Sequence, residues 1–69
     1  MQPIEVSING NRTLIPSTTT IEAALKSGGY QLQYAAVALN DSFVPRDDYT
    51  TQVLQPGDRV EVLMPFAGG

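Results

Sequence analysis

Hydrophobic and polar residues alternate near both ends of the chain, over residues 4–8 and again over residues 60–64. A period of two predicts β-strands that bury one face, so we expect the same kind of element at both ends. Asn9 and Gly10 follow the first alternating segment, and this dipeptide is a strong signal for a tight hairpin. Residues 12–15 should therefore return as the second strand.

The register of this hairpin depends on the length of its loop. A two-residue loop would turn Ile15 toward the face that carries Ile8, whereas a loop one residue longer would turn Leu14 there. We expect Leu14 to point inward, although the pattern by itself allows both registers. Pro16 should end the strand, because proline has no N–H for the ladder.

Helical spacing follows the hairpin. Ile21 and Leu25 are one turn apart and predict a short amphipathic helix with an apolar face. The threonines at positions 18–20 are candidate N-caps, and Thr19 with Glu22 fits a capping box.

A glycine pair should close this helix. We expect Gly28 or Gly29 to adopt the left-handed conformation that commonly ends helices. A glycine-rich phosphate loop would instead precede a helix and carry a lysine, and this pair does neither.

The rest of the chain predicts short elements joined by turns. Residues 34–39 are a run of small apolar residues that should form a strand, and residues 43–44 should start a short return strand. Residues 45–49 resemble the first turn of a short helix. Residues 55–58 carry proline and glycine where a type II turn needs them. We expect the core to contain Ile4, Val6, Ile21, Leu25, Val37, Leu39, Val60 and Val62.

The order of these elements predicts an α+β fold, a mixed sheet with one main helix packed on one face. We expect one domain over residues 1–65 and a flexible Gly-Gly tail over residues 66–69.

The composition excludes several kinds of site. The 69 residues contain no cysteine and no histidine, so thiolate nucleophiles, disulfides and the commonest general base are missing. Four scattered basic residues and a net charge of −3 argue against nucleic-acid binding. No apolar run is long enough to span a membrane, and no signal peptide is recognisable. The absence of disulfides in so small a domain favours the cytoplasm.

Few charged residues are candidates for chemistry. Asp47 and Asp48 could be a metal or acid–base pair, but neighbours on a helix do not face each other, so we expect a solvated helix start and no metal site. We expect Arg46 to form a local salt bridge with these acids, with partner contact as the alternative. Arg59 follows Asp58 in a turn and should have a structural role.

The C-terminal end is the remaining candidate for a functional site. Pro65 should end the last strand. The chain then continues through Phe66 and Ala67 to Gly68 and Gly69. Glycine has no Cβ, so it can pass through a narrow channel and leave its carbonyl carbon open to attack. Gly69 is therefore either part of a frayed terminus or a substrate that enters another protein's active site. We expect Phe66 to contact the partner rather than fold back onto the core.

Several motifs match one known pattern. They are VALNxxFVPR at 37–46, VLQxGDRVEV at 53–62, Ala-Gly-Gly at 67–69, the Ile-Asn-Gly hairpin at 8–10 and the helix start at 20–25. Together they resemble the ThiS family, the sulfur carriers of thiamine biosynthesis, over nearly the whole chain. The resemblance implies the ubiquitin-like β-grasp fold, in which the first and last strands lie side by side and parallel in mid-sheet.

The resemblance also implies the chemistry of the tail. The carboxylate of Gly69 would be adenylated by an E1-like, ThiF-like adenylyltransferase that uses ATP, and then converted to a thiocarboxylate with sulfur from a donor such as a cysteine desulfurase. A ThiG-like thiazole synthase would receive that sulfur. The chain would be a co-substrate with no bound cofactor and no catalytic residues, not an enzyme. Gly68 would be needed for passage, and Ala67 and Phe66 for partner contact.

One segment departs from the family pattern. Residues 64–66, Met-Pro-Phe, precede Ala-Gly-Gly, and a proline ahead of the tail is similar to MoaD, the molybdopterin sulfur carrier of the same fold. A ubiquitin-like modifier joined to lysine through its terminus is a further alternative. The three hypotheses share the terminal glycine and differ in what becomes of it.

Overall fold

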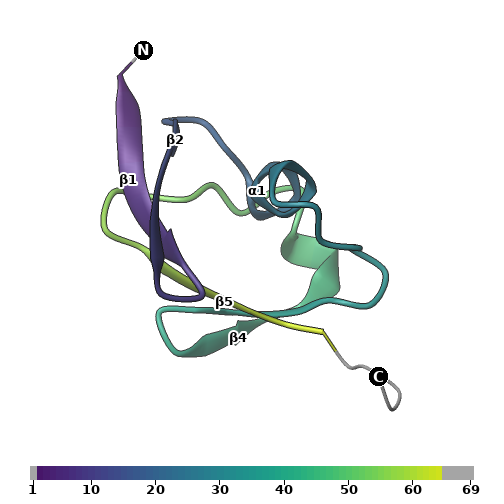
Figure 1. Cartoon of the computed structure of the whole chain (residues 1–69). Coiled ribbons are helices and arrows are strands. Elements are labelled where there is room, and N and C mark those ends of the chain that lie inside the picture. The colour runs from purple at the N-terminus through teal and green to yellow at the C-terminus, as the bar shows by residue number, and fades with distance from the viewer. Residues whose placement is uncertain (1, 65–69) are drawn as a thin grey trace.

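Five strands form one mixed sheet, and a single α-helix lies across one face of it (Figure 1). The computed structural model describes residues 2–64, so Met1, Pro65 and the predicted tail at 66–69 lie outside the described residues. The elements are β1 (Pro3–Ile8), β2 (Asn11–Pro16), α1 (Ile21–Ser27), β3 (Ala36–Leu39), β4 (Ser42–Val44), the 3₁₀ helix η1 (Arg46–Asp48) and β5 (Arg59–Leu63).

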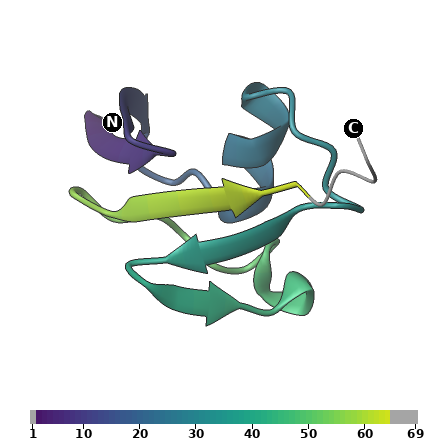
Figure 2. The ribbon, with the colours of Figure 1, turned by 60° about the horizontal axis from the view of Figure 1, so that its bottom comes forward.

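The first and last strands lie next to each other in the middle of the sheet. The strand order is β2-β1-β5-β3-β4, and β1 and β5 run parallel while every other neighbouring pair is antiparallel. Figure 2 shows β5, β3 and β4 side by side with α1 above them. The predicted α+β class and the parallel central pair implied by the family resemblance are both confirmed, and this topology is the β-grasp fold.

The expectation that Leu14 points inward was wrong. Ile8 pairs with Asn11, so the loop holds only two residues, and Asn9 and Gly10 have φ angles of 51° and 85°. These positive angles make the type I′ turn that a two-residue hairpin loop favours. Ile15 is therefore buried, and Leu14 lies on the opposite face.

The start of α1 also differs from the expected capping box. Thr20, not Thr19, is the N-cap, and its hydroxyl oxygen accepts a hydrogen bond of 3.2 Å from the amide of Ala23. The Thr19 hydroxyl instead donates to the Pro16 carbonyl at 2.7 Å. Thr20 has the extended backbone that an N-cap needs, which leaves Thr19 one position too early to cap.

The segment from Tyr49 to Leu54 is hydrogen-bonded to the start of α1. The amides of Ile21 and Glu22 donate to the carbonyls of Gln52 and Tyr49 at 3.0 and 2.9 Å. The first amides of a helix have no partner inside it, so this segment satisfies groups that would otherwise need water. The link ties the helix to the chain that leads into β5.

At the other end of α1, Gly29 has the expected left-handed conformation with a φ of 81°, while Gly28 remains right-handed. The Asn40 and Asp41 turn is a second type I′ turn, with φ angles of 50° and 71°. Gly57, with a φ of 84°, occupies the type II turn as expected.

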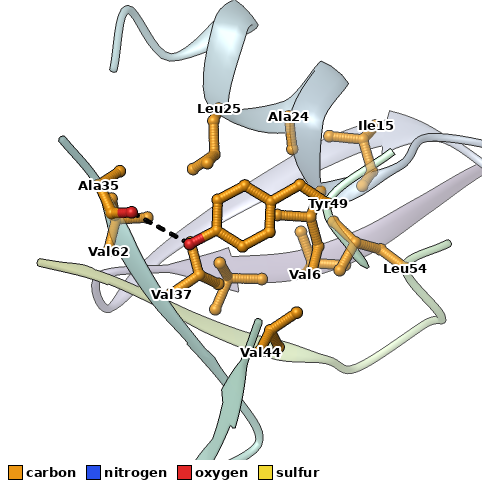
Figure 3. Packing of buried hydrophobic residues seen from close by; sticks show 12 residues of the cluster. Val6, Ile15, Ala24, Leu25, Ala35, Val37, Val44, Tyr49, Leu54 and Val62 are labelled. Carbon is orange, nitrogen blue, oxygen red and sulfur yellow. Dashed lines mark hydrogen bonds between the residues drawn. The ribbon is translucent and has the colours of Figure 1, made fainter. Parts of the chain in front are cut away.

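The core lies between α1 and the sheet (Figure 3). Six of the eight expected core residues are buried, and Ile4 and Leu39 are half-buried against the others. Tyr49 is an addition that the sequence did not indicate, and its hydroxyl donates to the Ala35 carbonyl at 3.0 Å inside the core. The buried residues are Val6, Ile15, Ile21, Ala24, Leu25, Ala35, Val37, Val44, Tyr49, Leu54, Val60 and Val62.

Candidate functional site

The predicted site residues Gly69, Gly68, Ala67 and Phe66 lie outside the described residues. The described part of the chain shows the platform from which they follow, which is the end of β5 and Met64. Five residues separate Met64 from the end of the sequence and span at most about 18 Å when extended. A protein that encloses the Gly69 carboxylate must therefore bring its own surface close to this end of β5.

The platform is anchored in the core. Val60 and Val62 point into the core and are buried, while residues 60 to 63 pair with β3 in an antiparallel ladder that places Leu63 opposite Ala36. Met64 is half-buried against the same core. Pairing thus holds the strand up to Leu63, and packing against the core holds Met64.

An exposed apolar patch surrounds this end of the strand on the sheet face opposite α1. Leu63 and Phe43 are 66% and 71% exposed, and the half-buried Ala36 and Ala38 lie between them in the register. Glu61 faces the same side beside Ala38. We call Leu63, Phe43, Ala36 and Ala38 the exit patch. Exposed apolar surface of this kind often marks a protein contact.

The exit patch was missed at the sequence level. The alternation of Val60, Val62 and Met64 implies that Leu63 lies on the outer face of the strand, which is the available signal. The pairing of β4 with β3 brings Phe43 to the same region, and that pairing needs the topology.

The charged residues of the described chain are the other candidates for chemistry. Residues 2–64 contain no group of three or more acidic residues placed to hold a metal ion. Asp47 and Asp48 lie in the exposed η1 turn. Arg46 forms no ion pair within residues 2–64, so the expected local salt bridge was wrong.

Arg59 has the structural role that was expected, although its partner is Asp41 rather than Asp58. The guanidinium donates to the Asp41 carboxylate at 2.6 Å, and both side chains are mostly exposed. This hydrogen bond, with the nearby negative charge, raises the pKa of Arg59 above its ordinary value. The pair joins the β3–β4 turn to the start of β5.

A shallow groove of about 220 Å³ lies between β2 and the end of α1. Its lining carries no acidic or basic side chain, and consists of Ile8, Asn11, Thr13, Ile15, Ala24, Ser27, Gly28 and Tyr30. The groove therefore presents no carboxylate and no amine or guanidinium, and Tyr30 is its one ionisable side chain. No helix among residues 2–64 is both long and apolar enough to cross a membrane.

The fold and its central final strand place the chain in the class of ubiquitin-like β-grasp proteins. Two solved structures resemble it over 96% of its length at 23% identity, a crystal structure and an NMR structure of the thiamine biosynthesis protein from Geobacter metallireducens. The crystal structure, of the protein named ThiS, is covered completely with a TM-score of 0.81, and the NMR structure over 88% with a TM-score of 0.77. No curated protein matches the sequence.

The ThiS family model matches residues 3–69, so this chain belongs to the ThiS family. The match includes the last three residues, which the structure does not describe. Members of this family are small carrier proteins and are generally not catalytic.

Proposed function

We propose that the chain carries sulfur as a thiocarboxylate on Gly69 for thiazole formation in thiamine biosynthesis. The observation that carries the proposal is the family match over residues 3–69, which takes in the Ala-Gly-Gly end. The anchored β5 platform and the exit patch support it, because they are what a partner needs in order to hold the domain while the tail enters an active site.

The chemistry has two steps, both at the terminal carboxylate. A carboxylate oxygen of Gly69 attacks the α-phosphorus of ATP, which releases pyrophosphate and leaves an acyl-adenylate. Hydrosulfide then attacks the carbonyl carbon, and AMP leaves with the bonding electron pair. If the donor is a protein persulfide, its terminal sulfur attacks instead and gives an acyl disulfide, which a second thiol of the donor system reduces to the thiocarboxylate as a disulfide forms. The product is –COS⁻, whose sulfur is the nucleophile for ring formation. The chain supplies the substrate group, and the partner supplies ATP binding and catalysis.

The proposed partners follow from these steps. They are a ThiF-like adenylyltransferase, a sulfur donor such as a cysteine desulfurase, and a ThiG-like thiazole synthase, all in the cytoplasm. The chain itself binds no cofactor in this scheme, because ATP is bound by the adenylating enzyme. The MoaD-like carrier and the ubiquitin-like modifier remain the alternatives. The first would pass its sulfur to molybdopterin synthesis, and the second would join its terminal glycine to a lysine of another protein.

ATP–pyrophosphate exchange with the cognate adenylating enzyme tests the first step. Wild type should support exchange, and deletion of Gly69 or Gly68→Val should abolish it. The deletion leaves the carboxylate about 3.3–3.6 Å short of the nucleotide, and a miss of even about 1 Å can cost 10²-fold in rate. Melting curves of the three proteins serve as the control for folding. Equal exchange by all three would show that the terminus is not the substrate.

A further inference from the structure

The two edges of β5 are paired to different extents. On one edge β3 pairs with β5 from Val60 to Leu63. On the other edge β1 pairs with β5 only through Ser7–Arg59 and Ile8–Val60, because β1 turns away at Asn9. The end of β5 that leads to the tail therefore has no strand on the β1 side.

The Asn9 side chain takes the place of that missing strand. The backbone amide of Asn9 donates to the Val60 carbonyl at 2.9 Å, as in a parallel ladder. The next bond of such a ladder would run from the Val62 amide to the backbone carbonyl of Asn9. The left-handed turn at Asn9 takes the backbone out of the ladder, and the Asn9 Oδ1 atom accepts from the Val62 amide at 2.8 Å instead.

Tyr30 fixes the orientation of this amide group. Asn9 Nδ2 donates to the Tyr30 hydroxyl at 3.1 Å, so Oδ1 is left to face Val62. The Tyr30 amide donates to the Leu25 carbonyl at 3.0 Å, which ties this loop to the end of α1. A Cβ on Gly28 would lie only 2.9 Å from the Tyr30 ring, so glycine at position 28 is what allows the ring to approach.

The second hairpin turn provides an internal comparison. Asn40 has nearly the same conformation as Asn9, with a φ of 50°, and it also bonds β5. The Asn40 Oδ1 atom accepts a hydrogen bond from the backbone amide of Arg59 at 2.8 Å. The backbone amide of Asn40 donates to the Arg59 carbonyl, also at 2.8 Å. Asn40 thus holds the start of β5, whereas Asn9 holds the strand two residues before Met64.

We infer that Asn9, oriented by Tyr30, is a positioning residue that fixes the direction of the chain where β5 ends at Met64, the residue from which the tail continues. The inference rests on the proposed function, because direction matters only if the carboxylate must reach a reacting phosphorus. Loss of the Asn9 contact frees the Val62 amide and lets Met64 swing on the unpaired edge. Leu63 stays paired with Ala36 of β3, so the exit patch is kept and the effect falls on turnover and not on partner binding.

The test compares Asn9→Gly and Tyr30→Phe with the control Asn40→Gly. Glycine accepts a positive φ, so both glycine variants keep their turns and lose only the side-chain bonds. Tyr30→Phe keeps the ring and removes the acceptor of the Asn9 amide. Amide hydrogen exchange by NMR reports each contact directly, and ATP–pyrophosphate exchange gives kcat and KM for the carrier.

We expect Asn9→Gly to speed exchange of the Val62 amide and to lower kcat by about tenfold, with KM changed by less than about twofold. Tyr30→Phe should show the same pattern more weakly. Asn40→Gly should speed exchange at Arg59 and leave kcat within about twofold. Equal kinetics for the two glycine variants, or unchanged Val62 exchange in Asn9→Gly, would overturn the inference. A wild-type protein that supports no ATP–pyrophosphate exchange would overturn the proposed function. The rate of hydrogen exchange at the Val62 amide would then decide by itself whether Asn9 holds the strand.

Discussion

At the scale of single residues, Tyr49 shows how a polar atom is accommodated in a small core. The ring is 4% exposed, and the hydroxyl donates to the Ala35 carbonyl, which directly precedes β3. The bond joins the segment after η1 to the strand that pairs with β5 (Figure 3). Tyr49 therefore contributes apolar contact and a tertiary hydrogen bond at once.

Replacing Tyr49 by phenylalanine should destabilise the protein while keeping its fold. The change leaves the Ala35 carbonyl without its buried donor, which typically costs about 1–3 kcal/mol. Urea denaturation followed by circular dichroism measures the free energy of unfolding. Tyr34→Phe is the matched control, because Tyr34 is 53% exposed and should tolerate loss of its hydroxyl. Equal stability of the two variants would contradict the assigned role of Tyr49.

The sequence could not have placed Tyr49 or Asn9 in these roles. Both depend on contacts between segments far apart in the chain, Tyr49 with Ala35 and Asn9 with Val62. Asn9 was interpreted only as a turn residue, which its φ angle confirms. Its side-chain bond to β5 follows from the parallel neighbours β1 and β5, and periodicity carries no information about which strands are neighbours.

At the scale of elements, the first hairpin sets which side of β2 enters the core. The type I′ turn at Asn9 and Gly10 fixes a two-residue loop, so Ile15 is buried and Leu14 is exposed. A change of one residue in loop length would exchange these two faces. The alternating pattern predicted the strand correctly, but Leu14 and Ile15 are similar enough in hydrophobicity that only the turn geometry separates them.

Alanine substitutions in β2 should therefore have very different effects. Ile15→Ala should cost about 2–5 kcal/mol, as expected for a large-to-small change in a core. Leu14→Ala should change stability by no more than about 0.5 kcal/mol, as exposed positions usually do. Thermal melts of both variants compare the two faces directly. The register described here would be contradicted if Leu14→Ala were the more damaging change.

The exit patch, on the sheet face opposite α1, leads to a separate prediction about partner binding. Leu63→Ser should raise the KM of the carrier for the adenylating enzyme by about tenfold, since an apolar anchor at an interface is often worth more than 1 kcal/mol. Leu14→Ser is the matched control, because Leu14 is 68% exposed on the same face but lies on the edge strand β2, away from the exit. A similar KM for both variants would show that the exit patch does not contact the enzyme.

At the scale of the whole molecule, residues 2–64 form a single sheet with its last strand near the centre. The parallel pairing of β1 and β5 puts the last strand in mid-sheet, where it has neighbours on both sides. Motif matching predicted this arrangement through the family resemblance, whereas element order alone gave only the α+β class. The candidate site itself was predicted from the terminal glycines and lies beyond the described residues, so the structure bears on its platform alone.

The fate of the Gly69 carboxylate is the central claim, and intact mass spectrometry tests it most directly. The protein is incubated with ATP, the cognate adenylating enzyme and sulfide, with parallel reactions that omit ATP or use the Gly69 deletion. A sulfur carrier should gain about 16 Da, the difference between sulfur and oxygen, only in the complete wild-type reaction. Fragmentation should place that mass on Gly69. An unchanged mass, or a covalent adduct with the mass of another protein, would contradict the account.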